Sequence, residues 1–347
     1  MKATPFGVIL VLFVAGSLSA EERAGPIPVE ISRQPGKAHI EIRAGGKPFT
    51  TFRFDEDLSK PVLFPVYAPS GAVMTRGYPI DPKPGESTDH PHHTGLWMNY
   101  GDVAGLDFWG NAGGYGKKPG FFQAAARWLP FGPSPTKGRI EHRRVRAMES
   151  GAGTGKLSVS AAWLDPDGDP LVHEATDFVF HASADRRAID RVAVLSAIGN
   201  TVPMPDNKEG FFALRLGPAL EESSRKNPAG TGAYHSSEGL EGKAVWGTRA
   251  KWVMLTGELA GKPVTVAVLD HPKNPGYPTY WHARGYGLFA ANPLGQKALS
   301  KGKETLDFRL QPGKPVRFAY RVVILSHAAS DSEIEAEHQS FAEASLP

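Results

Sequence analysis

The run Lys262-Pro263-Val264-Thr265-Val266-Ala267-Val268-Leu269 is the clearest sign of the fold class in this chain of 347 residues. It is mainly apolar and rich in valine, which is typical of a central strand in a sheet. Further short runs of β type occur at His39–Arg43, Lys156–Ser160, Thr176–His181 and Ala188–Leu195. The chain also holds 39 glycines and 30 prolines, which separate such runs. Regularly spaced short strands with turns of this kind predict an all-β sandwich or barrel.

The end of the chain is expected to close the sheet and then to change to helix. Leu306–Leu310 and Val316–Ser326 are predicted to form a hairpin that turns at Gln311-Pro312-Gly313-Lys314. Asp331–Ala344 has a helical pattern, with Ser332 as its predicted N-cap.

No linker divides the chain clearly, so we expect one β-sandwich domain over residues 21–330. A C-terminal helix and tail would follow over residues 331–347. Ile334 and Phe341 lie seven residues apart and therefore on one side of that helix.

Residues 1–20 resemble an export signal. Lys2 supplies a positive start, Val8–Ala15 form a short apolar core, and Ser17–Ala20 provide small residues for cleavage. The apolar core is too short for a permanent anchor, and no later stretch reaches the length of a membrane span. We therefore expect an exported protein, periplasmic or secreted, with no stable membrane span once the signal is removed.

Composition and charge exclude several classes of function. The chain has no cysteine, which excludes disulfides, thiol catalysis and iron–sulfur clusters. The formal net charge is only +3, from 39 basic and 36 acidic residues. Nucleic-acid-binding proteins usually carry a concentrated basic stripe, which this sequence lacks, so no nucleic-acid partner is expected.

The stretch Asp89-His90-Pro91-His92-His93-Thr94-Gly95-Leu96-Trp97 places three imidazoles and a carboxylate within five residues. A second segment, Asp270-His271-Pro272-Lys273-Asn274-Pro275, repeats the Asp-His-Pro triplet and is followed by Trp281-His282. Histidine titrates near neutral pH, so such clusters are suited to proton transfer or to metal binding. The repetition predicts that the two segments meet at one polar pocket.

Two chemistries fit these histidines. As acid and base, the candidate catalytic residues are His92, His93, His271 and His282, together with Glu209 at the entrance of an apolar strand. As metal ligands, His90, His92 and His93 would hold a divalent cation, although no short zinc signature such as His-Glu-x-x-His is present. No other cofactor is indicated.

Aromatic residues accompany these polar groups, and flat rings beside Asp, Asn, Arg and His are the usual lining of a sugar site. Arg249 lies in Trp246–Trp252; if that segment is extended, Arg249 could bind the carboxylate of a uronic acid, or could pair with Glu238 or Glu241. The candidate substrate-binding residues are Trp97, Asn99, Trp109, Arg249, Asp270, Asn274, Trp281 and Tyr286.

Several motifs in this order resemble an exported bacterial family of unknown function that has carried the label PmoA-like, or methane-oxygenase-like. The resemblance covers roughly residues 61–326. The matching motifs are Asp89–Trp97, Gly105–Trp109, Lys208–Phe211, Ser237–Gly239, Ala244–Gly247, Asp270–Pro275, Trp281-His282, Tyr286–Leu288 and Asn292-Pro293.

A membrane-bound methane oxygenase subunit needs several transmembrane helices, and this sequence has none after residues 1–20. The resemblance implies instead a large antiparallel β-sandwich of the galactose-mutarotase-like supersandwich type. It also implies a carbohydrate partner. The leading hypothesis is His/Glu acid–base chemistry on a sugar or glycan, of lyase, hydrolase or epimerase type. A metal-dependent enzyme and a non-catalytic carbohydrate-binding protein are the alternatives.

Overall fold

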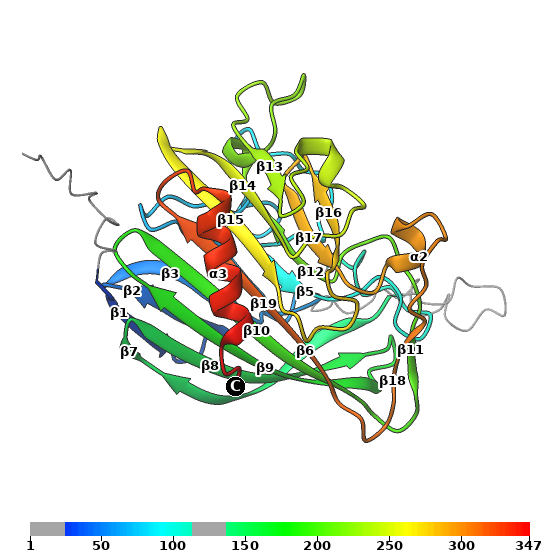
Figure 1. The fold of residues 1–347 in the computed structure, drawn as a ribbon. Helices are drawn as coiled ribbons and strands as arrows, with labels where there is room; N and C mark the ends of the chain where they lie inside the picture. The colour runs from blue at the N-terminus through cyan, green and yellow to red at the C-terminus, as the bar shows by residue number, and fades with distance from the viewer. Residues whose placement is uncertain (1–24, 113–136) are drawn as a thin grey trace, which may run out of the picture.

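The computed structural model describes residues 25–112 and 137–347, and these form two large antiparallel β-sheets (Figure 1). The fold class predicted from the sequence, an all-β antiparallel sandwich with a short C-terminal helix, is therefore confirmed. The predicted export signal lies outside the described residues. Within them, no helix has the length and apolar character that crossing a membrane requires.

The first sheet has nine strands, and strands that are neighbours in it are often far apart in the sequence. Its order is β16 (Tyr280–Arg284), β17 (Leu288–Asn292), β12 (Phe212–Arg215), β5 (Leu96–Met98), β4 (Val62–Val66), β3 (Lys47–Arg53), β2 (His39–Ala44), β1 (Pro28–Arg33) and β7 (Gly151–Ala152). Strands from the two ends of the chain thus lie in one sheet, and β12 joins β5 to the β16–β17 hairpin.

The second sheet has eight strands. Its order is β13 (Ala233–Ser236), β14 (Trp252–Leu259), β15 (Lys262–Asp270), β19 (Val316–Leu325), β10 (Arg186–Ala197), β9 (Pro170–Ala182), β8 (Thr154–Leu164) and β6 (Arg139–Glu149). The run that predicted a central strand is β15, which pairs with β14 and β19 and is buried from Val264 onward.

A small third sheet pairs β11 (Val202–Met204) with β18 (Phe308–Leu310). Four helical segments complete the described elements: the 3₁₀ helices η1 (Pro218–Leu220) and η2 (Gly242–Val245), the short α2 (Gln296–Leu299) and the longer α3 (Asp331–Glu343). The main core lies between the two large sheets and takes alternate residues from each, as the period of two in a strand requires.

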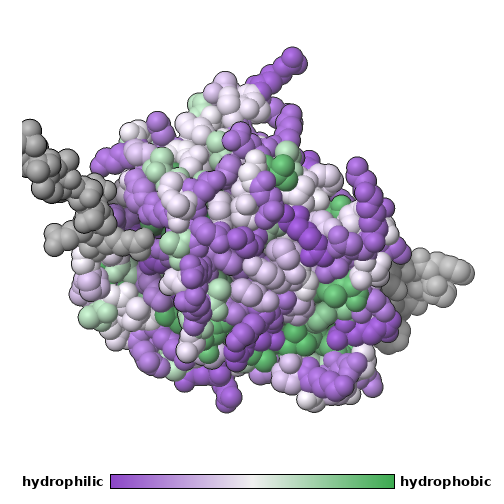
Figure 2. Space-filling view, in the orientation of Figure 1, coloured by the Kyte–Doolittle hydropathy of each residue, from purple (hydrophilic) through white to green (hydrophobic). Residues whose placement is uncertain are grey.

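Helix α3 covers the outer face of the eight-stranded sheet across β14 and β15 (Figure 1). Ile334 and Phe341 are both fully buried on that face, as their spacing predicted. The N-cap is Ser330 rather than Ser332, since the Ser330 side chain accepts a hydrogen bond from the Glu333 amide. Hydrophilic residues predominate on this side of the molecule, with hydrophobic residues in smaller patches (Figure 2).

Two local predictions were wrong. The turn at Gln311–Lys314 exists, but β18 pairs with β11, and β19 pairs with β10 and β15, so the expected hairpin does not form. A turn fixes a reversal of the chain but not the partner, and the long apolar β19 is buried best between two strands. Trp246–Trp252 is not extended either, because it follows η2 as a loop and only Trp252 begins a strand.

Candidate functional site

The outer face of the nine-stranded sheet carries a second, smaller apolar cluster beside polar residues. Strand pairing places His282, Ala290, Ala213 and Trp97 in one row across β16, β17, β12 and β5. Neighbouring residues such as Trp281 point the other way, into the main core. Because side chains alternate along a strand, one register puts a tryptophan and a histidine on the same outer face.

His93 lies at the centre of stacked rings on this face. Its imidazole stacks on Trp97 at 5.5 Å and meets Trp109 edge-on at 5.5 Å between ring centroids. Asn99 fixes Trp97 by accepting a 3.0 Å hydrogen bond from its indole N–H. Burial lowers the pKa of His93 far below its usual range, so His93 is a neutral, packed ring.

His90 extends this stack outward to the surface. Its ring lies parallel to His93 at 4.8 Å and to Tyr286 at 5.2 Å. Its Nδ1 is 3.1 Å from Oδ2 of Asp89, and its side chain is 41% exposed. The backbone of His90 has a φ of 43°, a left-handed conformation that is uncommon for a residue other than glycine and is found more often at functional sites.

Two buried arginines hold Asp89 in place. Nη1 of Arg76 lies 2.8 Å and Nη2 of Arg215 lies 3.0 Å from Oδ1 of Asp89, and both guanidinium side chains are 0% exposed. Although burial alone would raise it, the pKa of Asp89 falls to about 2 because Ser87 donates to the carboxylate and Arg215 and His90 lie close to it. Asp89 is therefore ionised at neutral pH and orients His90.

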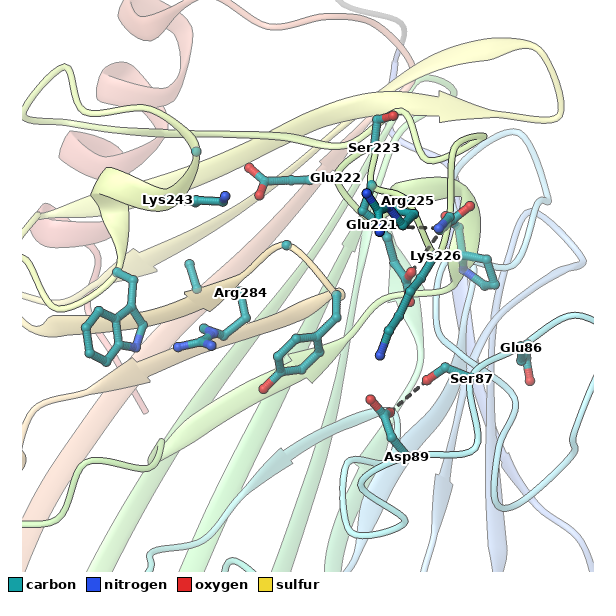
Figure 3. A pocket seen from close by; sticks show the side chains of 18 of the residues that line it. Glu86, Ser87, Asp89, Glu221, Glu222, Ser223, Arg225, Lys226, Lys243 and Arg284 are labelled. Carbon is teal, nitrogen blue, oxygen red and sulfur yellow. Dashed lines mark hydrogen bonds between the residues drawn. The ribbon is translucent and has the colours of Figure 1, made fainter.

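A cleft of about 890 Å³ opens beside Asp89 and Tyr286 (Figure 3). Trp246, which is 42% exposed, and Arg284 also line the cleft, and the Arg284 guanidinium lies 5.5 Å from the Trp246 ring and 5.8 Å from the Tyr286 ring. Charged residues also line the cleft: Glu221, Glu222, Arg225, Lys226 and Lys243. The volume lies within the range typical of small-molecule sites.

The pKa values of Glu221 and Asp89 shift in opposite directions, although both residues line this cleft. Burial raises the pKa of Glu221 above its ordinary value, while its Oε1 lies 3.9 Å from the same Arg215 nitrogen that binds Asp89. Two carboxyl groups with diverging pKa values in one site are suited to distinct acid and base roles.

His282 and Glu209, both expected from the sequence, lie near one another beside this face. Burial lowers the pKa of His282 to about 4, and the negative charge of Glu209 opposes that change. The carboxylate of Glu209 is partly exposed and lies 3.1 Å from Lys208. His92 is near the same face, but burial lowers its pKa to about 3, and its carbonyl accepts a hydrogen bond from Lys60. His92 is thus a weak base.

The second Asp-His-Pro triplet does not join the first. Asp270 is fully buried and accepts hydrogen bonds from Asn274 at 2.7 Å and from the Thr279 amide at 2.8 Å. The His271 ring meets Phe341 of α3 at 5.1 Å, on the outer side of the eight-stranded sheet. Asp270, His271 and Asn274 therefore anchor a turn beneath α3, and the prediction of one shared pocket was wrong. Both triplets form turns, and a turn motif does not specify which sheet it joins.

Arg249 and Trp281 also lie away from the cleft. The guanidinium of Arg249 pairs with Glu304 and lies over the ring of Tyr280, so neither Glu238 nor Glu241 is its partner. Trp281 is fully buried in the main core and donates to the Ala250 carbonyl at 3.0 Å. The binding role of Arg249 was predicted for an extended segment, and that segment is a loop. The binding role of Trp281 was predicted from its neighbour His282, but its side chain faces the core.

The three clustered histidines are not arranged as metal ligands. Among residues 25–112 and 137–347, no three His, Asp or Glu side chains are grouped to hold a metal ion. The rings of His90 and His93 are nearly parallel, 2° apart, so their in-plane lone pairs do not converge on one point. The rings stack instead of pointing at a common centre, and their closeness in the sequence does not reveal this stacking.

Four cleft or support residues were not predicted from the sequence, namely Arg76, Arg215, Arg284 and Glu221. One signal for Arg215 was present, because it is the single charged residue in the apolar run Phe211–Leu216. A charge in a buried strand needs a partner, which is a sign of a site. Arg76 and Glu221 lie in loops and gave no comparable local signal.

Residues 39–339 match a family of unknown function, DUF6807. The chain belongs to this family. No curated protein matches it.

Solved structures show remote likeness to this DUF6807 chain. A galactose mutarotase-like protein from Clostridium acetobutylicum is 10% identical, with a TM-score of 0.41, and the match covers 87% of this chain and 99% of that one. A glycoside hydrolase family 97 enzyme in complex with acarbose, from Pseudoalteromonas sp. strain K8, is 10% identical with a TM-score of 0.33. That match covers 87% of this chain and 34% of the hydrolase, so the DUF6807 chain spans about a third of its length. The galactosidase domain of the α-galactosidase–sucrose kinase AgaSK is 11% identical with a TM-score of 0.37, over 86% and 42% of the two chains.

Proposed function

We propose that this DUF6807 protein binds a carbohydrate in the cleft beside Tyr286 and performs acid–base chemistry on it. The observation that carries the proposal is the continuous arrangement of Trp246, Arg284 and Tyr286 next to the Asp89–His90 pair. Aromatic faces cover the apolar C–H surface of a sugar, while a few charged groups fix its hydroxyls. The signal-like residues 1–20 support a site of action outside the cytoplasm.

His90 is the proposed base. Its Nδ1 faces the ionised carboxylate of Asp89 at 3.1 Å, which orients the ring and stabilises the proton that it would accept. This is the orienting role that a carboxylate has in hydrolytic triads. His93, the sequence candidate beside it, is buried and strongly disfavours a proton, so it supports His90 by stacking.

Glu221 is the proposed acid, because its raised pKa favours the protonated form that can donate to a leaving oxygen. Asp89 and Glu221 approach the same Nη2 atom of Arg215, at 3.0 Å and 3.9 Å, so the proposed acid lies close to the carboxylate that orients the base. A His/Glu acid–base pair of this kind serves hydrolase, lyase or epimerase chemistry.

The test starts with a panel of oligosaccharides, with products followed by chromatography and binding by calorimetry. His90→Gln should lower turnover by about 100-fold and leave binding nearly unchanged, since a positioned base contributes on this scale. The matched control is His327→Gln, because His327 is 42% exposed and lies 3.0 Å from Glu333, outside the cleft.

Trp246→Ala should weaken binding by about tenfold, as expected when an aromatic platform is lost. Binding that survives in Trp246→Ala would contradict the position of the sugar. Turnover that survives in His90→Gln would contradict the assignment of the base. Binding without any turnover by the wild-type protein would favour the non-catalytic alternative.

A further inference from the structure

Arg284 presents a guanidinium to the cleft without a carboxylate partner among the described residues. Its side chain makes no ion pair or hydrogen bond there and lies between the rings of Trp246 and Tyr286. A ring holds a guanidinium through its face and leaves the N–H donors in the plane unused. The five donors of Arg284 are thus available to a ligand.

Four acidic residues, Glu86, Asp89, Glu221 and Glu222, line the cleft, but none of them pairs with Arg284 among the described residues. Glu86 is engaged by the backbone amides of Gly77, Tyr78 and Lys83, at 2.7 to 3.0 Å. Asp89 is engaged by the two buried arginines behind it. Glu86 and Asp89 are therefore committed to the protein rather than to a ligand.

Three more cations face the same space. Arg225, Lys226 and Lys243 line the cleft, and none of them forms an ion pair within the described residues. Figure 3 shows Lys226 directed toward Asp89 and Lys243 beside Glu222. Arg76 and Arg215 lie behind Asp89, and their Nε atoms are buried without a hydrogen-bond partner in the described part of the chain. With Arg76 and Arg215 counted, six cationic side chains lie in or beside the cleft, against the four carboxyl groups that line it.

We propose that the cleft selects an anionic sugar, one that carries a carboxylate or a sulfate, and that Arg284 binds this anion through two parallel hydrogen bonds. The proposal rests on the proposed function, because it names the substrate class of that site. An arginine fork matches the geometry of both anions. Trp246 and Tyr286 hold the fork in place, so little of its conformational freedom is lost on binding. The uronic acid partner expected for Arg249 is thus assigned to Arg284 instead.

The test compares sugars that differ only in charge. Trigalacturonate and its methyl ester serve as the carboxylate pair, and a galactose 6-sulfate disaccharide and its desulfated form serve as the sulfate pair, with Kd measured by calorimetry. The acidic member of one pair should bind at least tenfold more tightly, and added salt should reduce that preference. The pair that shows the preference identifies the anion.

Arg284→Gln should remove most of the tenfold preference, because it weakens binding of the acidic sugar more than binding of the neutral one. Arg284→Lys, which retains the charge but loses the fork, should restore only part of it. The matched control is Arg309→Gln, because Arg309 is exposed, lies outside the cleft and pairs with Asp307. It should leave both affinities unchanged.

The outcomes separate this inference from the proposed function. If neutral and acidic sugars bind equally and both require Trp246, the anionic preference is overturned and the sugar site stands. If the preference exists but persists in Arg284→Gln, the assignment to Arg284 is wrong. If no sugar of either kind binds the folded protein, both proposals fail.

Discussion

Asp89→Asn should destabilise the protein at neutral pH, because it removes the charge that two buried arginines share. The pKa of this carboxyl falls from its ordinary 3.8 to about 2 in the folded protein, a difference worth about 2.5 kcal/mol at full strength. The carboxylate is 44% exposed, so solvent screening reduces this contribution to about 1–2 kcal/mol. The uncompensated repulsion between Arg76 and Arg215 adds to the loss.

The pH dependence gives the sign of this effect. A carboxyl group with a lowered pKa stabilises the folded state above its ordinary pKa, and that stability is lost as the pH falls through the folded value. The free energy of unfolding of the wild type should therefore approach that of Asp89→Asn as the pH falls from about 4 to about 2. Urea unfolding, followed by circular dichroism, gives the free energy of unfolding of both proteins at each pH.

The control for this experiment is Asp81→Asn, because Asp81 also forms an ion pair, with Lys83 at 2.6 Å, but both side chains are exposed. It should change stability by less than about 0.5 kcal/mol at any pH. The reasoning is refuted if Asp89→Asn is no more costly than Asp81→Asn at pH 7. It is also refuted if the difference between wild type and Asp89→Asn stays constant on acidification.

Two further predictions concern parts of the molecule outside the cleft. Burial lowers the pKa of Lys60 from 10.5 to about 7, so the unfolded chain binds more protons than the folded protein between these two pH values. The wild type should therefore gain stability relative to Lys60→Met as the pH rises from 7 to 10. Urea midpoints that move in parallel for both proteins would contradict this. Phe341→Ala should lower the free energy of unfolding by about 3–5 kcal/mol, since Phe341 is fully buried against the Arg321 guanidinium at 4.8 Å. Thermal unfolding measures this change, and Met148→Ala, at an exposed position, should have little effect in the same experiment.

Part of the candidate site was predictable because its residues are close in sequence. The segment Asp89–Trp97 indicated a polar site with aromatic neighbours, and the structure places His90, His93 and Trp97 in one stack. Tyr286 was also expected there and stacks on His90. Arg284 was missed, although it follows Trp281-His282 by two residues, because its lack of an acidic partner becomes visible only in three dimensions.

The sequence by itself determined the all-β class, the central strand β15 and the final helix. The apolar, valine-rich run Lys262–Leu269 and the seven-residue spacing of Ile334 and Phe341 are local patterns, and such patterns follow from the composition and backbone geometry of one element. Only the tertiary structure decided that β18 pairs with β11 and that His271 lies beneath α3. Such pairings depend on which distant surfaces bury one another best, and the energy of that burial is not recorded in the spacing of any single segment.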